Sequence, residues 1–544
     1  MSRSAGILLV ATLVGCAGSP GRFTRSTVMW VDDDRHPFGP QPEERYAPQI
    51  WDAADNLVFR PAARALAFET SGESTNVNAM DEVPDSSWFT NRLGRHAMTP
   101  EEVALGACDH DEPMPSPPWR VVEGKVDGAT AGFVFEDSFG RRYVLKADRE
   151  AQPEQATAAD AIGAALYHAV GYFVPCNRVV FFEPDWIELD PDARIDPTHG
   201  VERDMTEEDL DEVYSYLRRA PDGRLRGLAS LYLDGEPLGP WDYRGTWDRD
   251  LNDVVDHQTR RELRGMFVLN AFVDHWDARQ HNTLSTWVEV DDDAGYVRHN
   301  LVDFGDTLGF VQGTHRRATR LGRSEYFDTQ HIAVDFLTLG LLVRPWDRVE
   351  RGPTWPVLGY FDVESFEPDQ WRPNYWNGAF EERTERDCAW MARILARLRE
   401  PHLRALVELG RWSDPAVERR LLRVLRGRRE KVLERWLDRR SPLAWPRTAE
   451  GGVCLEDLAV SSGLRDASAR RYRAEEGEGS AAISRPVRAA GAQVCVRLGR
   501  SNAAYRIVRV TAGTPGERVS SPLELHLRDG RVVGIERPSD EGRL

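Results

Sequence analysis

The segment HWDARQHN at residues 275–282, followed by RHNLVDFGDTLG at residues 298–309, is the most informative part of this chain. Residues 283–290 and 296–302 alternate apolar and polar side chains on either side of the turn DDDAG, a pattern typical of a β-hairpin. Residues 260–274, just upstream, have the apolar period of a helix. The sequence therefore predicts a helix, a polar loop, a hairpin and the tripeptide DFG, in that order.

The region upstream, residues 121–182, predicts a second set of elements. Residues 133–137 and 142–146 alternate around the turn SFG, which indicates another hairpin. Residues 154–172 then place Ala158, Ile162, Leu166 and Val170 on one stripe, as expected of an amphipathic helix, and residues 177–182 indicate a strand. The predicted order is hairpin, helix, strand.

Four polar features occur along these elements in a fixed order. They are a lysine at the end of a hairpin strand, a glutamate at the start of the next helix, D-x-x-x-x-N after a later helix, and DFG after a further hairpin. Together they resemble the protein kinase-like fold, over about residues 121–440. The resemblance is nearest to the divergent bacterial and secreted branches, such as the HipA and CotH kinases. RRELRG (260–265), DARQHNTL (277–284) and RHNLVDFGDTLG (298–309) also resemble a group of uncharacterised bacterial proteins.

The resemblance implies a role for each polar residue in binding ATP and Mg²⁺ or Mn²⁺. Lys146 would meet the α- and β-phosphates, and Glu154 would pair with it from the helix. Asp303 would hold a metal ion that bridges the phosphates, and Asn282 would hold a second ion, since Mg²⁺ prefers oxygen ligands. Asp277 would accept the proton of the acceptor hydroxyl.

Two features depart from the family pattern. Gly124, Gly128 and Gly132 could offer backbone amides to phosphates, but they are spaced by four residues rather than as G-x-G-x-x-G. Glu154 follows the lysine by only eight residues, which leaves Glu150 as an alternative partner.

The catalytic loop itself departs from the family by having HWD at 275–277 in place of HRD, so we do not expect control by phosphorylation of an activation loop. One hypothesis for the chain is a phosphotransferase acting on a protein or a small hydroxyl-bearing acceptor. A second is an inactive, pseudokinase-like binding or scaffold protein, because an intact set of charges does not imply turnover. Adenylyl transfer is a third.

The N-terminus predicts export. Arg3 precedes an apolar run at residues 5–14, which is shorter than the roughly 20 residues that span a bilayer. The run ends in LVGC at 13–16, which resembles the lipobox of bacterial lipoproteins, so we expect cleavage before Cys16 and acylation of its thiol. The chain would then be a lipid-anchored protein of the cell envelope. Ala17 favours the outer membrane.

The composition limits the classes of molecule that the chain is expected to bind. The chain has 544 residues and a formal net charge of −18, which argues against nucleic acid and against binding anionic lipid through a basic face. The expected partners are a nucleotide, an envelope protein and, through the acyl chains, a membrane.

The expected fold class is α+β: a two-lobed kinase-like fold with an N-terminal extension and a small C-terminal all-β domain. The predicted parts are a signal peptide (1–15), a tether and extension wrapped on the first lobe (16–118), an N-lobe (119–185), a C-lobe with an insertion (186–442) and the β domain (443–544). Short alternating runs after residue 450 indicate the last of these.

Five cysteines remain after Cys16. We predict that Cys454 and Cys495, on alternating runs of the C-terminal region, form the only disulfide within a domain. Cys176 and Cys388 are expected to stay free as small buried side chains.

Overall fold

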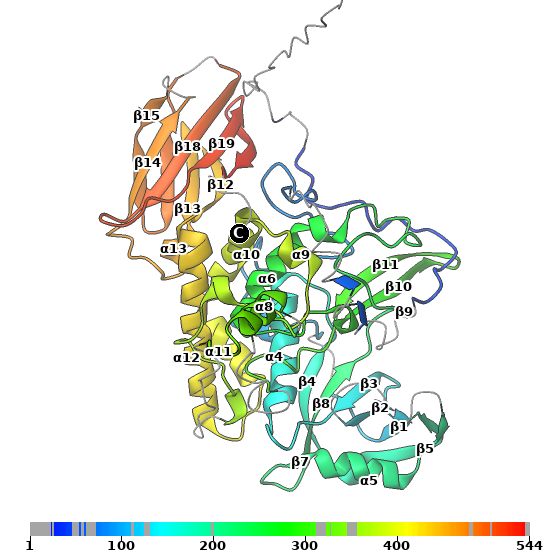
Figure 1. Cartoon of the computed structure of the whole chain (residues 1–544). Coiled ribbons are helices and arrows are strands. Elements are labelled where there is room, and N and C mark those ends of the chain that lie inside the picture. Colours follow the sequence, from blue (N-terminus) through cyan, green and yellow to red (C-terminus); the bar gives the residue numbers. More distant parts are fainter. Residues whose placement is uncertain are drawn as a thin grey trace, which may run out of the picture.

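The computed structural model describes residues 23, 27–45, 54–55, 59–60, 72–109, 114–124, 131–196, 201–311, 322–326, 328–344, 356–477, 482–500 and 503–538. The predicted signal peptide, Cys16 and Gly128 lie outside these residues. Within them the chain is α+β, as expected (Figure 1). None of the helices that can be described is both long and apolar enough to cross a bilayer.

A mixed sheet of eight strands forms the first part of the fold. Its order is β4-β8-β3-β2-β1-β5-β6, with β7 paired to β8. The predicted hairpin and strand are confirmed as β2, β3 and β4. The strands are β1 (Trp119–Gly124), β2 (Gly132–Glu136), β3 (Arg142–Lys146), β4 (Asn177–Phe182), β5 (Ile187–Ile195), β6 (Arg203–Asp204), β7 (Arg218–Arg219) and β8 (Leu225–Leu231).

The sequence predicted that residues 186–231 belong to a second lobe with an insertion, and this prediction is wrong. Strand β8 lies between β4 and β3, and β5 pairs with β1 in parallel. Helix α5 (Glu207–Tyr216) contributes Leu210 and Val213 to the apolar cluster that contains the aromatic residues of β1 and β2. This segment therefore completes the first sheet.

Helix α4 (Gln155–Val170), predicted as residues 154–172, joins the sheet to the helical part of the molecule. Every residue of the helix except His168 is buried. Its sequence QATAADAIGAALYHAV is rich in alanine, a strong helix former whose small side chain lets neighbouring elements approach closely. The helix belongs to the largest apolar core, which it shares with α6, α10, α11 and α12.

The remaining central elements are a three-stranded sheet, ordered β11-β10-β9, and a group of helices. The predicted hairpin and the helix just upstream of it are confirmed as β10, β11 and α6. The elements are α3 (Pro100–Leu105), β9 (Glu236–Gly239), α6 (Arg261–Val273), β10 (Thr283–Asp291), β11 (Ala294–Leu301), α8 (Thr329–Leu337), α9 (Gly378–Glu381), α10 (Glu385–Ala396), α11 (Glu400–Glu408), α12 (Pro415–Val432) and a π-helical turn (Leu433–Asp438).

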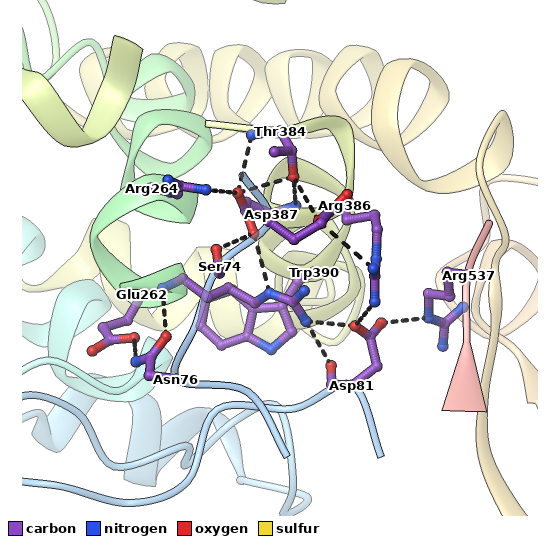
Figure 2. A network of polar contacts seen from close by, with 12 residues as sticks. Ser74, Asn76, Asp81, Glu262, Arg264, Thr384, Arg386, Asp387, Trp390 and Arg537 are labelled. Carbon is purple, nitrogen blue, oxygen red and sulfur yellow. Dashed lines mark hydrogen bonds and ion pairs between the residues drawn. The ribbon is translucent and has the colours of Figure 1, made fainter. Parts of the chain in front are cut away.

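The N-terminal extension contacts the first sheet, where the Ser138 N–H donates to the carbonyl oxygen of Ser116 at 3.0 Å, and it also packs into the helical core. Trp88 and Phe89 are buried there, and the Phe89 ring lies 5.4 Å from that of Trp390 on α10. A buried polar network fixes the same segment (Figure 2). Asp387 of α10 accepts hydrogen bonds from Ser74 Oγ at 2.6 Å and from Arg261 Nε at 3.2 Å.

Asp81 is the centre of this network, because arginines from three parts of the chain contact its carboxylate (Figure 2). Burial acts to raise the pKa of Asp81, but the four guanidinium groups outweigh it and hold the pKa well below the usual carboxyl range. The network thereby joins the N-terminal segment, α6, α10 and the C-terminal region. The four are Arg261, Arg386, Arg393 and Arg537.

The C-terminal region forms two antiparallel sheets around one apolar core, ordered β12-β13-β17-β16 and β15-β14-β18-β19-β20. A one-turn helix, α13 (Leu458–Ser461), interrupts the strands. They are β12 (Leu443–Ala449), β13 (Gly452–Asp457), β14 (Arg471–Glu476), β15 (Ile483–Arg485), β16 (Val487–Ala490), β17 (Gln493–Arg497), β18 (Tyr505–Gly513), β19 (Leu523–Arg528) and β20 (Arg531–Glu536).

The predicted disulfide between Cys454 and Cys495 is confirmed, since the two residues lie opposite each other on β13 and β17. The expectation for Cys176 is wrong. Cys176 is not free but is bonded to Cys108, which lies just after α3. Helix α3 packs on α4, so it brings Cys108 beside the start of β4. Cys388 is free and buried, as predicted.

Candidate functional site

The hairpin formed by β10 and β11 brings two of the predicted site residues to one end. Thr283, the first residue of β10, is paired with Leu301, the last residue of β11. Just beyond it, the Val302 N–H donates to the carbonyl oxygen of Asn282 at 3.0 Å. Asn282 and Asp303 therefore emerge together from the same end of the hairpin.

Lys146, at the end of β3, lies between two carboxylates. Its Nζ is 2.8 Å from Oδ2 of Asp160 and 3.1 Å from Oδ1 of Asp303. Burial acts to lower the pKa of Lys146, but the two carboxylates outweigh it and raise the pKa above its usual value, so the ammonium group is charged. The Asp303 side chain is 55% exposed, and its backbone has a φ of 59°. The structure thus joins the sheet, α4 and the DFG segment at one ammonium group.

Asp160 is held in place by donors from two other elements. Its Oδ1 accepts from Asn177 Nδ2 at 2.8 Å and from the Phe304 backbone N–H at 3.0 Å. Gly163, nearly one turn further along α4, makes the close approach possible, because a Cβ there would lie 2.5 Å from that of Phe304. The DFG segment therefore packs directly against the helix that carries Asp160.

The predicted partner of Lys146, Glu154, is wrong. Helix α4 begins only at Gln155, and Glu154 precedes it in a left-handed conformation with a φ of 70°. From there its carboxylate contacts Arg218, with 3.3 Å between Oε1 and Nη1. Glu150, the alternative, is exposed. The residue that reaches the lysine lies more than one turn inside the helix.

The predicted base and the second metal ligand contact each other. Asn282 Nδ2 lies 2.7 Å from the backbone oxygen of Asp277 and 3.2 Å from its Oδ2. Arg279 Nε lies 3.1 Å from Oδ1 of the same aspartate, whose backbone N–H donates to Asp306 Oδ2 at 2.9 Å. One short loop therefore fixes the aspartate and the asparagine.

Asp306 and His275 form a buried second layer behind this loop. Burial, with Asp277 and Asp303 nearby, raises the pKa of Asp306 well above its usual value. Burial lowers the pKa of His275 to about 4, so its ring is neutral at pH 7. The Tyr167 hydroxyl lies 3.1 Å from Nδ1 of this histidine, and Asp306 Oδ1 faces Nε2 at 3.4 Å.

The glycines give mixed support to a phosphate-binding loop. Gly124 ends β1, where a Cβ would lie 2.6 Å from Ile195, so packing against β5 explains this glycine. Gly132 begins β2 and is paired with Lys146. Gly128 lies outside the described residues, as stated above.

The polar oxygens of the site suit a hard metal ion. Asp303 offers an exposed carboxylate, and Asn282, whose Nδ2 is directed to Asp277, offers Oδ1. Carboxylate and amide oxygens are the ligands that Mg²⁺ takes, together with several waters and substrate phosphates. The residues present therefore fit a divalent cation bound together with a phosphate ester.

Comparisons with known proteins give little more. No family model matches the sequence, and no curated protein matches it. Two solved structures are similar to part of the chain, and both are crystal structures of the Golgi casein kinase. The first is 11% identical over 60% of this chain and 74% of that chain, with a TM-score of 0.25. The second, with Mn/ADP bound, is 13% identical over 59% and 74%, with a TM-score of 0.22.

Two residues of the site, Asp160 and Asp306, were not predicted from the sequence. Asp160 is the single charged residue in the alanine-rich run of α4, and a charged residue that a helix buries needs a partner. That signal was present in the sequence. Asp306 follows the DFG aspartate by three residues, and only the fold reveals its contact with the loop at 277.

Proposed function

We propose that this chain is a kinase-like phosphotransferase that binds a nucleoside triphosphate and a divalent cation. The observation that carries the proposal is the position of Lys146, whose ammonium group is held by Asp160 of α4 and Asp303 of the DFG segment. Phosphoryl transfer requires mainly positioned charge around the phosphates and metal ions. A lysine fixed by a helix carboxylate, next to a metal-binding aspartate, meets that requirement.

Each residue has a role on this proposal. Lys146 would bind phosphate oxygens, and Asp303 and Asn282 would hold the cation, which neutralises charge on the phosphates when bound. Asp277 would accept the proton of the acceptor hydroxyl, with Asn282 orienting its carboxylate at 3.2 Å. Asp160 would be a positioning residue for the lysine.

The proposal is tested by thermal melting with Mg²⁺ or Mn²⁺ and ATP, together with transfer of labelled γ-phosphate to an envelope extract. A ligand that binds the folded state adds RT ln(1 + [L]/Kd), about 2.7 kcal/mol at a hundredfold excess over Kd. Asp303→Asn should abolish the shift, whereas Asp277→Asn should keep the shift and lose transfer. Asp292→Asn, on the exposed turn of the same hairpin, is the matched control and should change neither.

The outcomes separate the hypotheses. No shift with any nucleotide and metal would refute nucleotide binding and leave a scaffold protein. A shift without labelled transfer would refute phosphotransfer. Label transferred from α-labelled rather than γ-labelled ATP would indicate adenylyl transfer instead.

We further propose that the chain is anchored to an envelope membrane through Cys16. Phe23 gives this proposal a geometric consequence, because its backbone N–H contacts the Tyr505 hydroxyl at 3.3 Å and its carbonyl oxygen accepts from Arg528 at 3.0 Å. Seven residues of extended chain reach at most about 25 Å. An acylated Cys16 would therefore keep the C-terminal sheets close to the bilayer.

The anchor is tested by substituting Cys16→Ser in the full chain. Because one acylated residue would be the attachment, the variant should remain unprocessed or appear in the soluble fraction, while the unsubstituted chain stays with membranes after a high-salt wash. A Cys16→Ser chain that is processed and still membrane-bound would refute the proposal.

A further inference from the structure

A cavity of about 600 Å³ lies on a different part of the first sheet from the Lys146 site. The end of α4, the loop after it, β11, and the segment that leaves β8 all contribute to its walls. This volume is in the range of small-molecule sites. The polar and aromatic residues that define it here are Arg92, Arg141, His168, Phe173, Asp234 and Arg298.

Three arginines surround one aromatic ring at this cavity. The guanidinium carbons of Arg298, Arg92 and Arg35 lie 5.4, 5.7 and 5.8 Å from the centre of the Phe173 ring. Each contact with the ring is favourable, but three like charges around a single ring repel one another. The chain as a whole has a formal net charge of −18, so this cluster is locally positive in a negatively charged protein.

The carboxylates around the cavity only partly balance these charges. Asp234 lies 3.7 Å from Arg298 but has a side chain 89% exposed, where an ion pair contributes little. Arg92 Nη1 donates to the backbone oxygens of His168 and Tyr172 at 2.8 and 3.3 Å rather than to a carboxylate. Burial lowers the pKa of Arg92 to about 10, which still leaves it charged at pH 7.

Two further charged residues line the cavity. Arg141 is paired with Asp137 at 2.5 Å, and Asp109 contributes a second carboxylate to the wall. His168 adds a neutral group, because burial lowers its pKa to about 3. Its Nδ1 is buried and makes no hydrogen bond within the described part of the chain. The cavity therefore presents mainly cationic donors, while the buried Nδ1 of His168 is not open to it.

From this arrangement we infer that the cavity is a binding site for a small phosphate-bearing anion. Guanidinium groups match phosphate oxygens in geometry and form the stronger, charge-assisted class of hydrogen bonds. A phosphate between Arg92 and Arg298 relieves their mutual repulsion. The site is separate from the proposed nucleotide site and stands without it.

The test is isothermal titration of the chain from Phe23 onward with inorganic pyrophosphate, in EDTA so that no metal-dependent nucleotide site contributes. We expect one pyrophosphate per chain. Arg298→Gln should weaken binding by at least about tenfold, the loss expected for one charge-assisted contact. Arg142→Gln, a neighbouring strand-end arginine outside the cavity, is the matched control and should bind as the unsubstituted chain does.

A second variant guards against simple misfolding. Asp234→Asn removes a competing carboxylate from an exposed position and should tighten binding about threefold, an effect that misfolding cannot produce. Asp303→Asn should bind pyrophosphate normally even where it loses the response to ATP. The inference would be overturned if the unsubstituted chain did not bind pyrophosphate, or if Arg298→Gln bound it as tightly as the unsubstituted chain. It would also be overturned if Asp303→Asn were the only variant to lose binding. Citrate that binds as tightly as pyrophosphate would overturn the choice of phosphate.

Discussion

The partner of Lys146 can be tested by a pair of substitutions, Asp160→Asn and Glu154→Gln. At the 2.8 Å distance between Nζ and Oδ2, the attraction in a medium of effective dielectric constant 20 is about 6 kcal/mol. Desolvation of the two buried groups cancels much of it, and removing one partner of a buried pair typically destabilises a protein by about 3–5 kcal/mol. Asp303 remains 3.1 Å from the lysine and keeps part of its charge compensated, so we expect a loss at or just below the lower limit of that range, about 2–3 kcal/mol.

Glu154→Gln should behave differently. The Glu154 side chain is only 6% exposed, but Arg218 is 42% exposed and screened by solvent, and glutamine keeps the shape of the side chain, so loss of the ion pair should change stability by no more than about 1 kcal/mol. A glutamine oxygen can still accept from the Ser413 N–H, which Glu154 now does at 3.0 Å. The lysine and the DFG segment should be unaffected.

The assay is urea unfolding followed by tryptophan fluorescence, with the melting response to Mg²⁺ and ATP measured on the same samples. Asp160→Asn should lower the free energy of unfolding and weaken the nucleotide response, because the lysine loses its helix contact. Glu154→Gln should change neither. The reasoning fails if Asp160→Asn is as stable and as responsive as the parent chain, or if Glu154→Gln alone loses the response.

Three other features give predictions of their own. In denaturant without reductant, the chain from Phe23 onward should titrate one thiol, Cys388, and five after reduction; three thiols before reduction would contradict one of the two disulfides. Burial raises the pKa of Asp250 to about 7, so this carboxyl destabilises the fold increasingly as the pH rises from about 4 to 7. Asp250→Asn should therefore stabilise the chain at pH 8, by at most about 4 kcal/mol, and hardly at pH 4; equal effects at both pH values in urea unfolding would refute this. Asp81→Asn should destabilise by more than about 3 kcal/mol, because it leaves three buried arginines and the partly exposed Arg386 without their shared carboxylate, and unchanged resistance to limited proteolysis would count against that estimate.

Periodicity predicted most of the elements that position the site. Both hairpins, the helix now bounded as Gln155–Val170 and the strand at 177–182 follow from local alternation or a helical stripe, which depend only on neighbouring residues. The order of Lys146, Asp277, Asn282 and Asp303 along these elements could also be seen. Their proximity could not, since contacts such as the one between residues 146 and 303 depend on how the sheet packs on the helices.

Two of the errors have a common physical cause, because tertiary packing determines both the place of β8 and the pairing of Cys108. Strand β8, LRGLASL, lacks clean alternation because six of its seven residues are buried, so the sequence did not separate it from a loop-rich insertion. The pairing of Cys108 with Cys176 spans 68 residues and depends on α3 packing against α4. Asp160 was overlooked for a different reason, because the stripe analysis counted apolar residues and passed over the one charge among them.

The arginines of the RRELRG segment (260–265) lie at the start of α6, where they contact carboxylates from other parts of the chain. Arg261 contacts both Asp81 and Asp387, so one side chain at the start of α6 joins the N-terminal segment to α10. Arg537, from the end of the C-terminal sheets, contacts the same Asp81. A buried carboxylate shared in this way is stable only while all its partners are present, so removing either end of the chain leaves uncompensated charge in the core. The segment at 72–95 and the C-terminal sheets are therefore expected to fold together with the helices that carry the candidate site, and neither should be separable from it without loss of stability.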